Sequence, residues 1–164
     1  MVMADLVQYL TLGIAEEIFA APVERVQEIL ELRHVARLPH APDYLLGMID
    51  VRGQSIPVVD LRLKLGLPVA ADCDATRIVV LKVTAGGRKV ILGLKADRVF
   101  EVTVLDDGAL GPPPEIGVPW RSESIAGIGR RNGAFVTVLD LDHVFAAAEA
   151  PHLVSEPVAA ENAA

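Results

Sequence analysis

Asp60 and Asp140 are the residues whose type and surroundings most resemble a catalytic pair. Each directly follows an apolar, strand-like run, and the two positions lie 80 residues apart in similar sequence. Two carboxylates brought together by a duplicated unit can share a proton and act as an acid–base dyad. Each aspartate is followed by leucine, however, and not by the small residues that expose such carboxylates. We therefore interpret both as N-caps of short helices, with a dyad hydrolase as the alternative.

The other reactive side chains form no catalytic or metal-binding pattern. The four histidines share no ligand spacing, and none lies near the single cysteine. They are His34, His40, His143 and His152. Cys73 stands between two aspartates, which disfavour a thiolate, so a nucleophilic role is not expected. The sequence has no glycine-rich nucleotide loop and no nucleophile elbow. We expect no catalytic residue, no metal and no cofactor.

Composition narrows the function classes further. The chain has 164 residues, 52% of them apolar, and a net charge of −7. This length suits one domain, or two small subdomains around a shared core. The acidic balance argues against nucleic acid and anionic membrane surfaces as partners. We see no signal peptide and no apolar run of membrane-spanning length, and a lone cysteine fits a reducing compartment. We expect a cytoplasmic protein with no direct membrane insertion.

The element that must position Asp60 is a hairpin predicted over residues 47–62. Gly53 separates two apolar runs and can adopt the positive φ of a tight turn. Several residues of the second run are β-branched and suit a buried strand. Pro57 lies inside this run and cannot donate a hydrogen bond to a neighbouring strand. We therefore expect the second strand to lie at a sheet edge or to be bulged at Pro57.

The same pattern returns around Asp140. Leu46–Leu65 matches Ala126–Phe145 without a gap. The identical pairs are Gly47/Gly127, Gly53/Gly133, Val58/Val138, Asp60/Asp140 and Leu61/Leu141. Upstream, Leu12-Gly13 matches Leu92-Gly93 at the same offset. We interpret two copies of one β-rich unit related by a pseudo-twofold axis. The alternative is that any two hairpins followed by helices look alike.

Most of the remaining chain predicts short strands. They are expected over residues 6–14, 18–21, 76–84, 88–94 and 97–105. A helical turn after Pro22 should pass into an extended edge over residues 26–32, with Arg25 and Glu28 facing solvent. In the strand after Asp97 we expect Val102 to face inward and Thr103 outward.

The C-terminal part is less regular. Residues 111–114 predict a stiff connector, and Trp120 is typical of a core or boundary position. Residues 149–164 lack periodicity and predict a flexible tail. About ten short strands with short helices at the hairpin ends predict an all-β fold built as two small barrels or half-barrels.

One set of motifs is specific enough to indicate a family. The motifs are Glu28-Ile29, Leu38 to Pro42, Tyr44, Gly47, Val51-Arg52-Gly53, Ile56 to Arg62, Gly127-Ile128 and Leu139-Asp140-Leu141. Together they resemble the CheW family of bacterial chemotaxis coupling proteins, over residues 6–148. The resemblance implies two pseudo-symmetric five-stranded β-barrels that share a hydrophobic core, with the flexible tail following as residues 149–164.

The resemblance also implies a function without catalysis. CheW-like proteins are adaptors that couple transmembrane chemoreceptors, the methyl-accepting chemotaxis proteins, to the histidine kinase CheA. The implied partners are a receptor cytoplasmic tip and the CheA regulatory domain. The protein would be mostly monomeric alone and recruited to membrane-associated receptor arrays. The alternative is a CheW-like scaffold module of a non-motility chemosensory pathway or of another two-component assembly.

Site residues carried over from the family fall into two groups. An apolar receptor groove between the subdomains would be lined by Val26, Glu28 and Ile29, with Arg52 at its edge. It would take a helical hairpin from the receptor. Kinase contact would involve Gly47 and Ile49, at the end of a barrel.

The chemistry of Arg52 alone allows two readings. It is either an exposed, locally paired turn residue or a charge-assisted anchor for a protein partner. The second copy has Asn132 at the matching position, so an arginine-specific role belongs to one copy only. The family commonly has Asn where this chain has Asp50. Asp cannot donate as an amide does, and we expect Asp50 to pair with Arg52.

Overall fold

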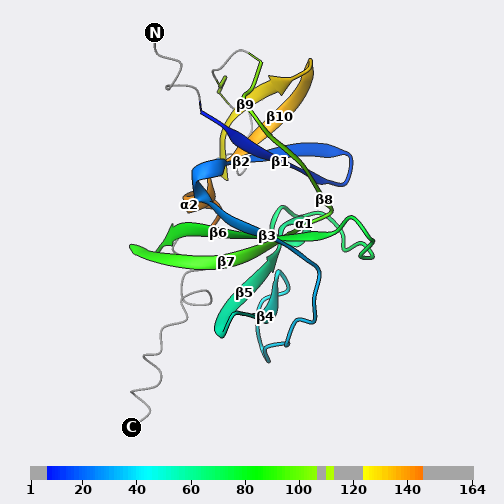
Figure 1. Cartoon of the computed structure of the whole chain (residues 1–164), viewed down its shortest axis with the longest axis vertical. Coiled ribbons are helices and arrows are strands. Elements are labelled where there is room, and N and C mark those ends of the chain that lie inside the picture. The colour runs from blue at the N-terminus through cyan, green and yellow to red at the C-terminus, as the bar shows by residue number, and fades with distance from the viewer. Residues whose placement is uncertain (1–6, 107–109, 113–123, 146–164) are drawn as a thin grey trace.

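The computed structural model describes residues 7–106, 110–112 and 124–145. Within these residues ten strands form two five-stranded sheets, with three short helical segments (Figure 1). The strands are β1 Tyr9–Ile14, β2 Glu17–Pro22, β3 Val26–Glu31, β4 Leu45–Val51, β5 Gln54–Asp60, β6 Arg77–Ala85, β7 Arg88–Ala96, β8 Arg98–Thr103, β9 Ile125–Arg131 and β10 Ala134–Leu139. The helical segments are η2 Val23–Arg25, α1 Leu61–Lys64 and α2 Leu141–Val144. Trp120 and residues 149–164 lie outside the described residues.

The strands divide into two sheets with the same internal order. The first sheet runs β8-β1-β2-β10-β9 and forms the upper half of Figure 1, while the second runs β3-β6-β7-β5-β4 below it. The predicted fold class, all-β with a few short helices, is confirmed. None of the helices in the described parts of the chain has the length and apolar character needed to cross a lipid bilayer.

The two sheets are related by a circular permutation. The second sheet uses five consecutive strands, β3 to β7, whereas the first uses β8, β9 and β10 followed by β1 and β2. The N-terminal hairpin therefore completes the unit that the C-terminal strands begin. By this order β2 corresponds to β7, because each pairs in parallel with the strand that precedes a helix.

The permutation corrects one sequence match. Gly13 lies in β1 and Gly93 in β7, and β1 corresponds to β6 rather than to β7. The match of Leu12-Gly13 with Leu92-Gly93 therefore does not mark equivalent positions. Strand pairing, and not a constant offset along the chain, defines equivalence in this part of the fold.

The hairpin repeat itself holds in atomic register. In β4–β5 the pairs Gly47↔Val58 and Leu45↔Val59 enclose a bulge. In β9–β10 the equivalent pairs enclose a bulge at the same place: Gly127↔Val138 and Ile125↔Leu139. Both aspartates cap helices as predicted. Arg62 N donates to Asp60 Oδ1 at 3.0 Å, and His143 N donates to Asp140 Oδ1 at 3.2 Å.

The hydrophobic core has a shared centre and one smaller cluster in each sheet. The central cluster contains fully buried residues of both sheets, among them Leu12, Leu81 and Leu139. A second cluster lies within the second sheet around Ile56 and Val80. A third lies within the first sheet around Val136 and Val138. The predicted shared core is therefore confirmed, and it joins the two sheets into one unit.

Two local predictions are wrong. The strand with Pro57 is neither an edge strand nor bulged at the proline, because β5 lies between β4 and β7 and Pro57 pairs in register with Met48. The ladder to β7 begins only at Val58, so no hydrogen bond to β7 is required from the proline nitrogen. In β8, Val102 is 49% exposed and Thr103 is buried. Thr103 shares the inward face with Leu105, and its hydroxyl donates to the Val104 carbonyl at 3.2 Å.

Candidate partner-binding surface

The tip of the β4–β5 hairpin presents Arg52 to solvent. The turn places Arg52 at φ 52° and Gly53 at φ 83°, both in the left-handed region. The Arg52 guanidinium reaches β3 and binds the carboxylate of Glu28 through two contacts, one of them Nη1 to Oε1 at 3.3 Å. This hydrogen bonding with Arg52 is the main reason that the pKa of Glu28 is lowered. The structure thus brings together two residues that the sequence leaves 24 positions apart.

Residues Val26 and Ile29 lie on the other face of β3. Ile29 is paired with Val79, and Val26 with Leu81, both of which belong to the central core cluster. Cross-strand partners share a face, so Val26 and Ile29 lie on the face directed toward the first sheet. Val26 is half-buried against the core, while Ile29 is 42% exposed. Val26 and Ile29 therefore form an apolar pair on one face of the edge strand β3. On the other face, Glu28 of β3 forms an ion pair with Arg52 of the hairpin tip.

The two predicted kinase-binding residues are buried in the second sheet. Ile49 is 3% exposed and belongs to the cluster inside that sheet. A Cβ on Gly47 would lie 2.0 Å from the carbonyl oxygen of Ala36. Between them, Met48 exchanges two 2.8 Å backbone hydrogen bonds with Ala36. Gly47 and Ile49 thus hold the β3–β4 connection on the sheet edge, and their kinase contact stays a prediction.

The expected pairing of Asp50 with Arg52 is wrong. Asp50 Oδ1 accepts a hydrogen bond from Gly53 N at 2.8 Å and closes the turn. This is the short-range contact by which Asp commonly stabilises turns. Asp50 therefore shapes the hairpin tip, and Glu28 holds the arginine.

Arg25 was expected to face solvent, but it forms an ion pair. Its guanidinium binds the carboxylate of Asp142 in α2 through two 2.9 Å contacts. Asp142 Oδ1 also accepts from the Thr84 N–H at 2.9 Å. The hydrogen bonds from Arg25 are the main cause of the lowered pKa of Asp142. This fork ties η2, β6 and α2 together at the junction of the sheets.

The pKa of the Cys73 thiol is shifted in the direction opposite to the sequence expectation. A backbone hydrogen bond from Ala75 and a side-chain hydrogen bond from Thr76 lower it. The neighbouring aspartates do not reverse this effect. Among the described residues, no three His, Cys, Asp or Glu side chains gather closely enough to hold a metal ion.

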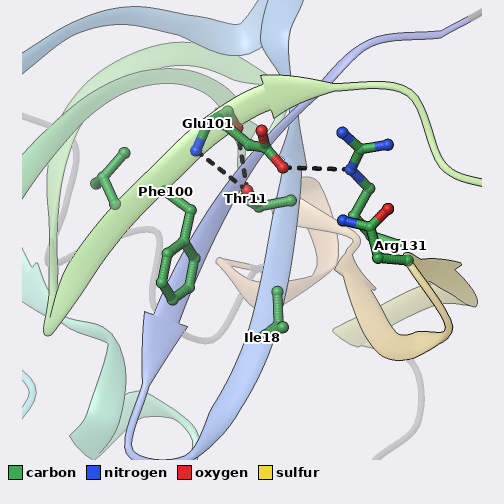
Figure 2. A pocket seen from close by; sticks show the side chains of 7 residues that line it. Thr11, Ile18, Phe100, Glu101 and Arg131 are labelled. Carbon is green, nitrogen blue, oxygen red and sulfur yellow. Dashed lines mark hydrogen bonds and ion pairs between the residues drawn. The ribbon is translucent and has the colours of Figure 1, made fainter.

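The first sheet carries an ion pair that the sequence reasoning missed. Glu101 of β8 pairs with Nε of Arg131, at the end of β9, at 3.2 Å. Figure 2 shows this pair beside Thr11, whose hydroxyl donates to the Glu101 carbonyl at 3.0 Å. The pair lines a cavity of about 450 Å³, with Phe100 and Ile18 along its apolar side. Because β8 corresponds to β3, each sheet contains an ion pair between an arginine at a hairpin tip and a glutamate of the equivalent edge strand, β3 or β8.

The comparison with known proteins decides the family. The CheW-like domain family model matches residues 8–149, which include all ten described strands. The chain belongs to the CheW-like family. It is 28% identical over 136 residues to the chemotaxis protein CheW of Rhizobium meliloti, covering 83% of this chain and 85% of that one. It is 29% identical over 140 residues to the Helicobacter pylori chemotaxis protein CheW, covering 85% and 82%.

Two further similarities bear on the function. The chain is 30% identical over 112 residues to protein FrzA of Myxococcus xanthus, covering 68% of this chain and 67% of that one. Among solved structures it is similar to the scaffolding protein TtCheW from Thermoanaerobacter tengcongensis, with a TM-score of 0.73 and 25% identity. That match covers 85% of this CheW-like chain and 92% of the solved one.

Proposed function

We propose that this protein is a non-catalytic chemotaxis adaptor that couples transmembrane chemoreceptors to the histidine kinase CheA. The observation that carries the proposal is the CheW-like match across both sheets, which includes the hairpin and the β3 edge. Relatives named as chemotaxis proteins match over most of their own length as well. Such an adaptor would work in the cytoplasm and be recruited to membrane-associated receptor arrays.

The receptor side of the proposal uses both faces of β3. A receptor helical hairpin would bury Ile29, which is 42% exposed, beside the half-buried Val26. Arg52 would add a charge-assisted contact, because its side chain is 71% exposed although it already holds Glu28. A guanidinium has five N–H donors, so two contacts with Glu28 leave others for a partner carboxylate.

The kinase side of the proposal is indirect. Gly47 and Ile49 are buried, so they would act by fixing the β3–β4 connection that a CheA regulatory domain contacts. The proposal includes no catalysis. Asp60 and Asp140, the candidate dyad, each accept a backbone N–H at a helix start, which accounts for both carboxylates.

A second candidate function keeps the surfaces and changes the partners. The similarity to protein FrzA, at 30% identity, is to a relative whose name does not mention chemotaxis. The chain would then be a scaffold module of a non-motility chemosensory pathway or of another two-component assembly. The same hairpin tip and β3 edge would serve both.

Binding measurements with two partners from the same organism test the proposal. The partners are a receptor cytoplasmic tip and a CheA regulatory domain. Wild type is compared with Arg52→Ala and with Lys82→Ala, which removes an exposed cation from β6 as a matched control. Circular dichroism confirms that each variant is folded. We expect wild type and Lys82→Ala to bind both partners, and Arg52→Ala to lose most of its receptor affinity while keeping the kinase.

Three outcomes would count against parts of the proposal. If wild type binds neither partner, the coupling function fails for this chain. If it binds the kinase but no receptor tip, the scaffold of another assembly is favoured. If Arg52→Ala binds the receptor as wild type does, the hairpin tip is not part of the receptor contact.

A further inference from the structure

The connection between β3 and β4 lines a cationic pocket whose walls contain none of the six residues predicted to contact a partner. The pocket has a volume of about 330 Å³. Three cationic side chains line it: Arg33 and Arg37 from the connection, and Lys95 from β7. One carboxylate, that of Asp72, lies among them. This local excess of positive charge stands out in a chain whose net charge is −7.

The two arginines keep their charges available. Arg33 donates through Nη1 to the carbonyl oxygen of Asp50 at 3.3 Å, its charge contributes to the lowered pKa of Glu28, and it forms no ion pair with a carboxylate among the described residues. Arg37 forms no ion pair within the described residues, and both arginines are exposed. Lys95 is different, because it is paired with Asp72 and its side chain is only 17% exposed. Within the part of the chain that the structure describes, Arg33 and Arg37 are thus the cations of the pocket that form no ion pair.

The remaining walls of the pocket are partly apolar. Leu32, Val35 and Leu46 line it between the cations. Leu32 is 36% exposed, and Val35 and Leu46 are half-buried against the cluster inside the second sheet. A small inorganic anion would leave these apolar surfaces unused. A peptide segment with an apolar side chain between carboxylates would match both the walls and the charges.

We propose that this pocket binds an acidic segment of a protein partner, in which carboxylates flank an apolar side chain. Arg33 and Arg37 bind the carboxylates, and Leu32, Val35 and Leu46 receive the apolar side chain. Arginine suits this role because its planar guanidinium can bind a carboxylate through two parallel hydrogen bonds. The receptor-contact residue Arg52 does not line the pocket, but the pocket lies on the β3–β4 connection that the proposed function assigns to the kinase side. Peptide binding by the full chain tests the pocket without either of those partners.

Fluorescence polarisation with the full chain tests the proposal. The probe is a labelled peptide of alternating Leu and Glu, and its matched control has Gln at every Glu. We expect the Glu peptide to bind at least about tenfold more tightly and to weaken as salt is added. We expect Arg33→Glu with Arg37→Glu to lose at least about tenfold in affinity. Lys82→Glu with Lys89→Glu reverses the same number of charges outside the pocket and should change it by less than about threefold.

Two further variants separate the pocket from its surroundings. Asp72→Asn keeps an oxygen that can accept from Lys95 but removes the opposing charge, so the Glu peptide should bind about fivefold more tightly. Arg130→Ala removes an exposed cation from the first sheet and should leave peptide affinity unchanged within about twofold. A gain of affinity cannot come from a damaged fold, so Asp72→Asn keeps the test valid if the arginine reversals disturb folding. In that case Arg33→Gln with Arg37→Gln replaces them.

The proposal is overturned by any of four results. The Glu and Gln peptides could bind equally, or both charge-reversed proteins could lose affinity equally. Asp72→Asn could leave affinity unchanged or lower it. Finally, inorganic phosphate could displace the Glu peptide at the same concentration as unlabelled peptide does, which would assign the pocket to a small oxyanion.

Discussion

The two β-hairpins that lead into α1 and α2 share a backbone but differ in the side chains that hold their turns. The first turn residues, Arg52 and Asn132, have φ values of 52° and 54°, and the glycines that follow have 83° and 82°. In β4–β5 the turn is closed by Asp50 of the same hairpin. In β9–β10 that position is Arg130, which cannot accept a hydrogen bond and instead lies over the Phe135 ring at 4.8 Å.

The second turn obtains its acceptor from a different segment. Asp106, which follows β8, accepts from Asn132 N at 2.9 Å and from Gly133 N at 3.0 Å. The arginines that pair with the glutamates of β3 and β8 also differ in exposure, since the Arg52 side chain is 71% exposed and the Arg131 side chain is 33% exposed. Turn geometry is thus fixed by the backbone, while the tip side chains are free to diverge. The first hairpin has the more exposed arginine of the two.

The helix junctions show the same divergence with the charges exchanged. Asp142, the second residue of α2, binds Arg25 in the segment before β3. Arg62, the second residue of α1, binds Asp97 just before β8 at 3.1 Å. The two junctions are equivalent in the permuted order, yet acid and base have changed places. Both copies thus hold an ion pair at this position, with opposite direction.

Replacing the glycines opposite the bulges should produce the largest difference in stability between the two copies. A Cβ on Gly47 would lie 2.0 Å from the backbone oxygen of Ala36, at a φ of 146°. A Cβ on Gly127 would lie 2.7 Å from Leu110 Cβ and 2.8 Å from the carbonyl oxygen of Gly111, a milder clash, and Gly127 has no comparable φ strain. We expect Gly47→Ala to destabilise the protein by about 4 kcal/mol and Gly127→Ala by about 2 kcal/mol. Urea unfolding of both variants measures this, and an equal or reversed order would contradict it.

The two ion pairs at the helix junctions should each contribute a smaller free energy to stability. Arg25 and Asp142 are about one third exposed, with side-chain values of 32% and 37%, so solvent screens them. Arg62 and Asp97 are more buried, at 15% and 27%. We expect double-mutant cycles with alanine to give about 0.5 kcal/mol of coupling for the first pair and about 1 kcal/mol for the second. Coupling indistinguishable from zero in both cycles would show that the junctions need no ion pair.

Asp106, which accepts hydrogen bonds from the β9–β10 turn, should make the free energy of unfolding depend on pH. Hydrogen bonds from Gly133 N and then Asn132 N lower the pKa of Asp106 below 3.8. A lowered folded pKa adds stability above the unfolded value, and this stability is lost as pH falls through the folded value. Asp106→Asn should therefore lose stability near neutral pH and approach wild type in acid. Thermal unfolding of both proteins from pH 7 to about pH 2 measures the difference, and parallel curves would remove Asp106 from the account.

Sequence reasoning succeeded where the repeat is local and failed where it is not. Gly53, Asp60 and their counterparts occupy turns and caps defined by a few neighbouring residues, so their roles could be read directly. The permutation could not be read, because strand pairing joins β1 to β8 and β2 to β10, strands that lie far later in the chain. The fold class could be predicted, but not which strands of the two copies are equivalent.

The candidate site shows the same limit. The family resemblance named Glu28 and Arg52, but their pairing depends on how β3 lies beside the hairpin. The Glu101–Arg131 pair was missed because Arg131 is one position before the residue that aligns with Arg52. Ion pairs between elements depend on side-chain reach across the fold, and spacing along a sequence does not report it.

The smallest effect on stability is expected from exchanging the tip residue of one copy for that of the other. Asn132 already occupies the left-handed position of the second turn, and asparagine adopts that conformation more readily than most residues. Arg52→Asn should therefore leave the melting temperature unchanged. Its receptor affinity should fall as far as that of Arg52→Ala, because the guanidinium is lost in both. If Arg52→Asn keeps wild-type receptor binding, the hairpin backbone and not the arginine is the anchor, and the functional difference between the copies disappears.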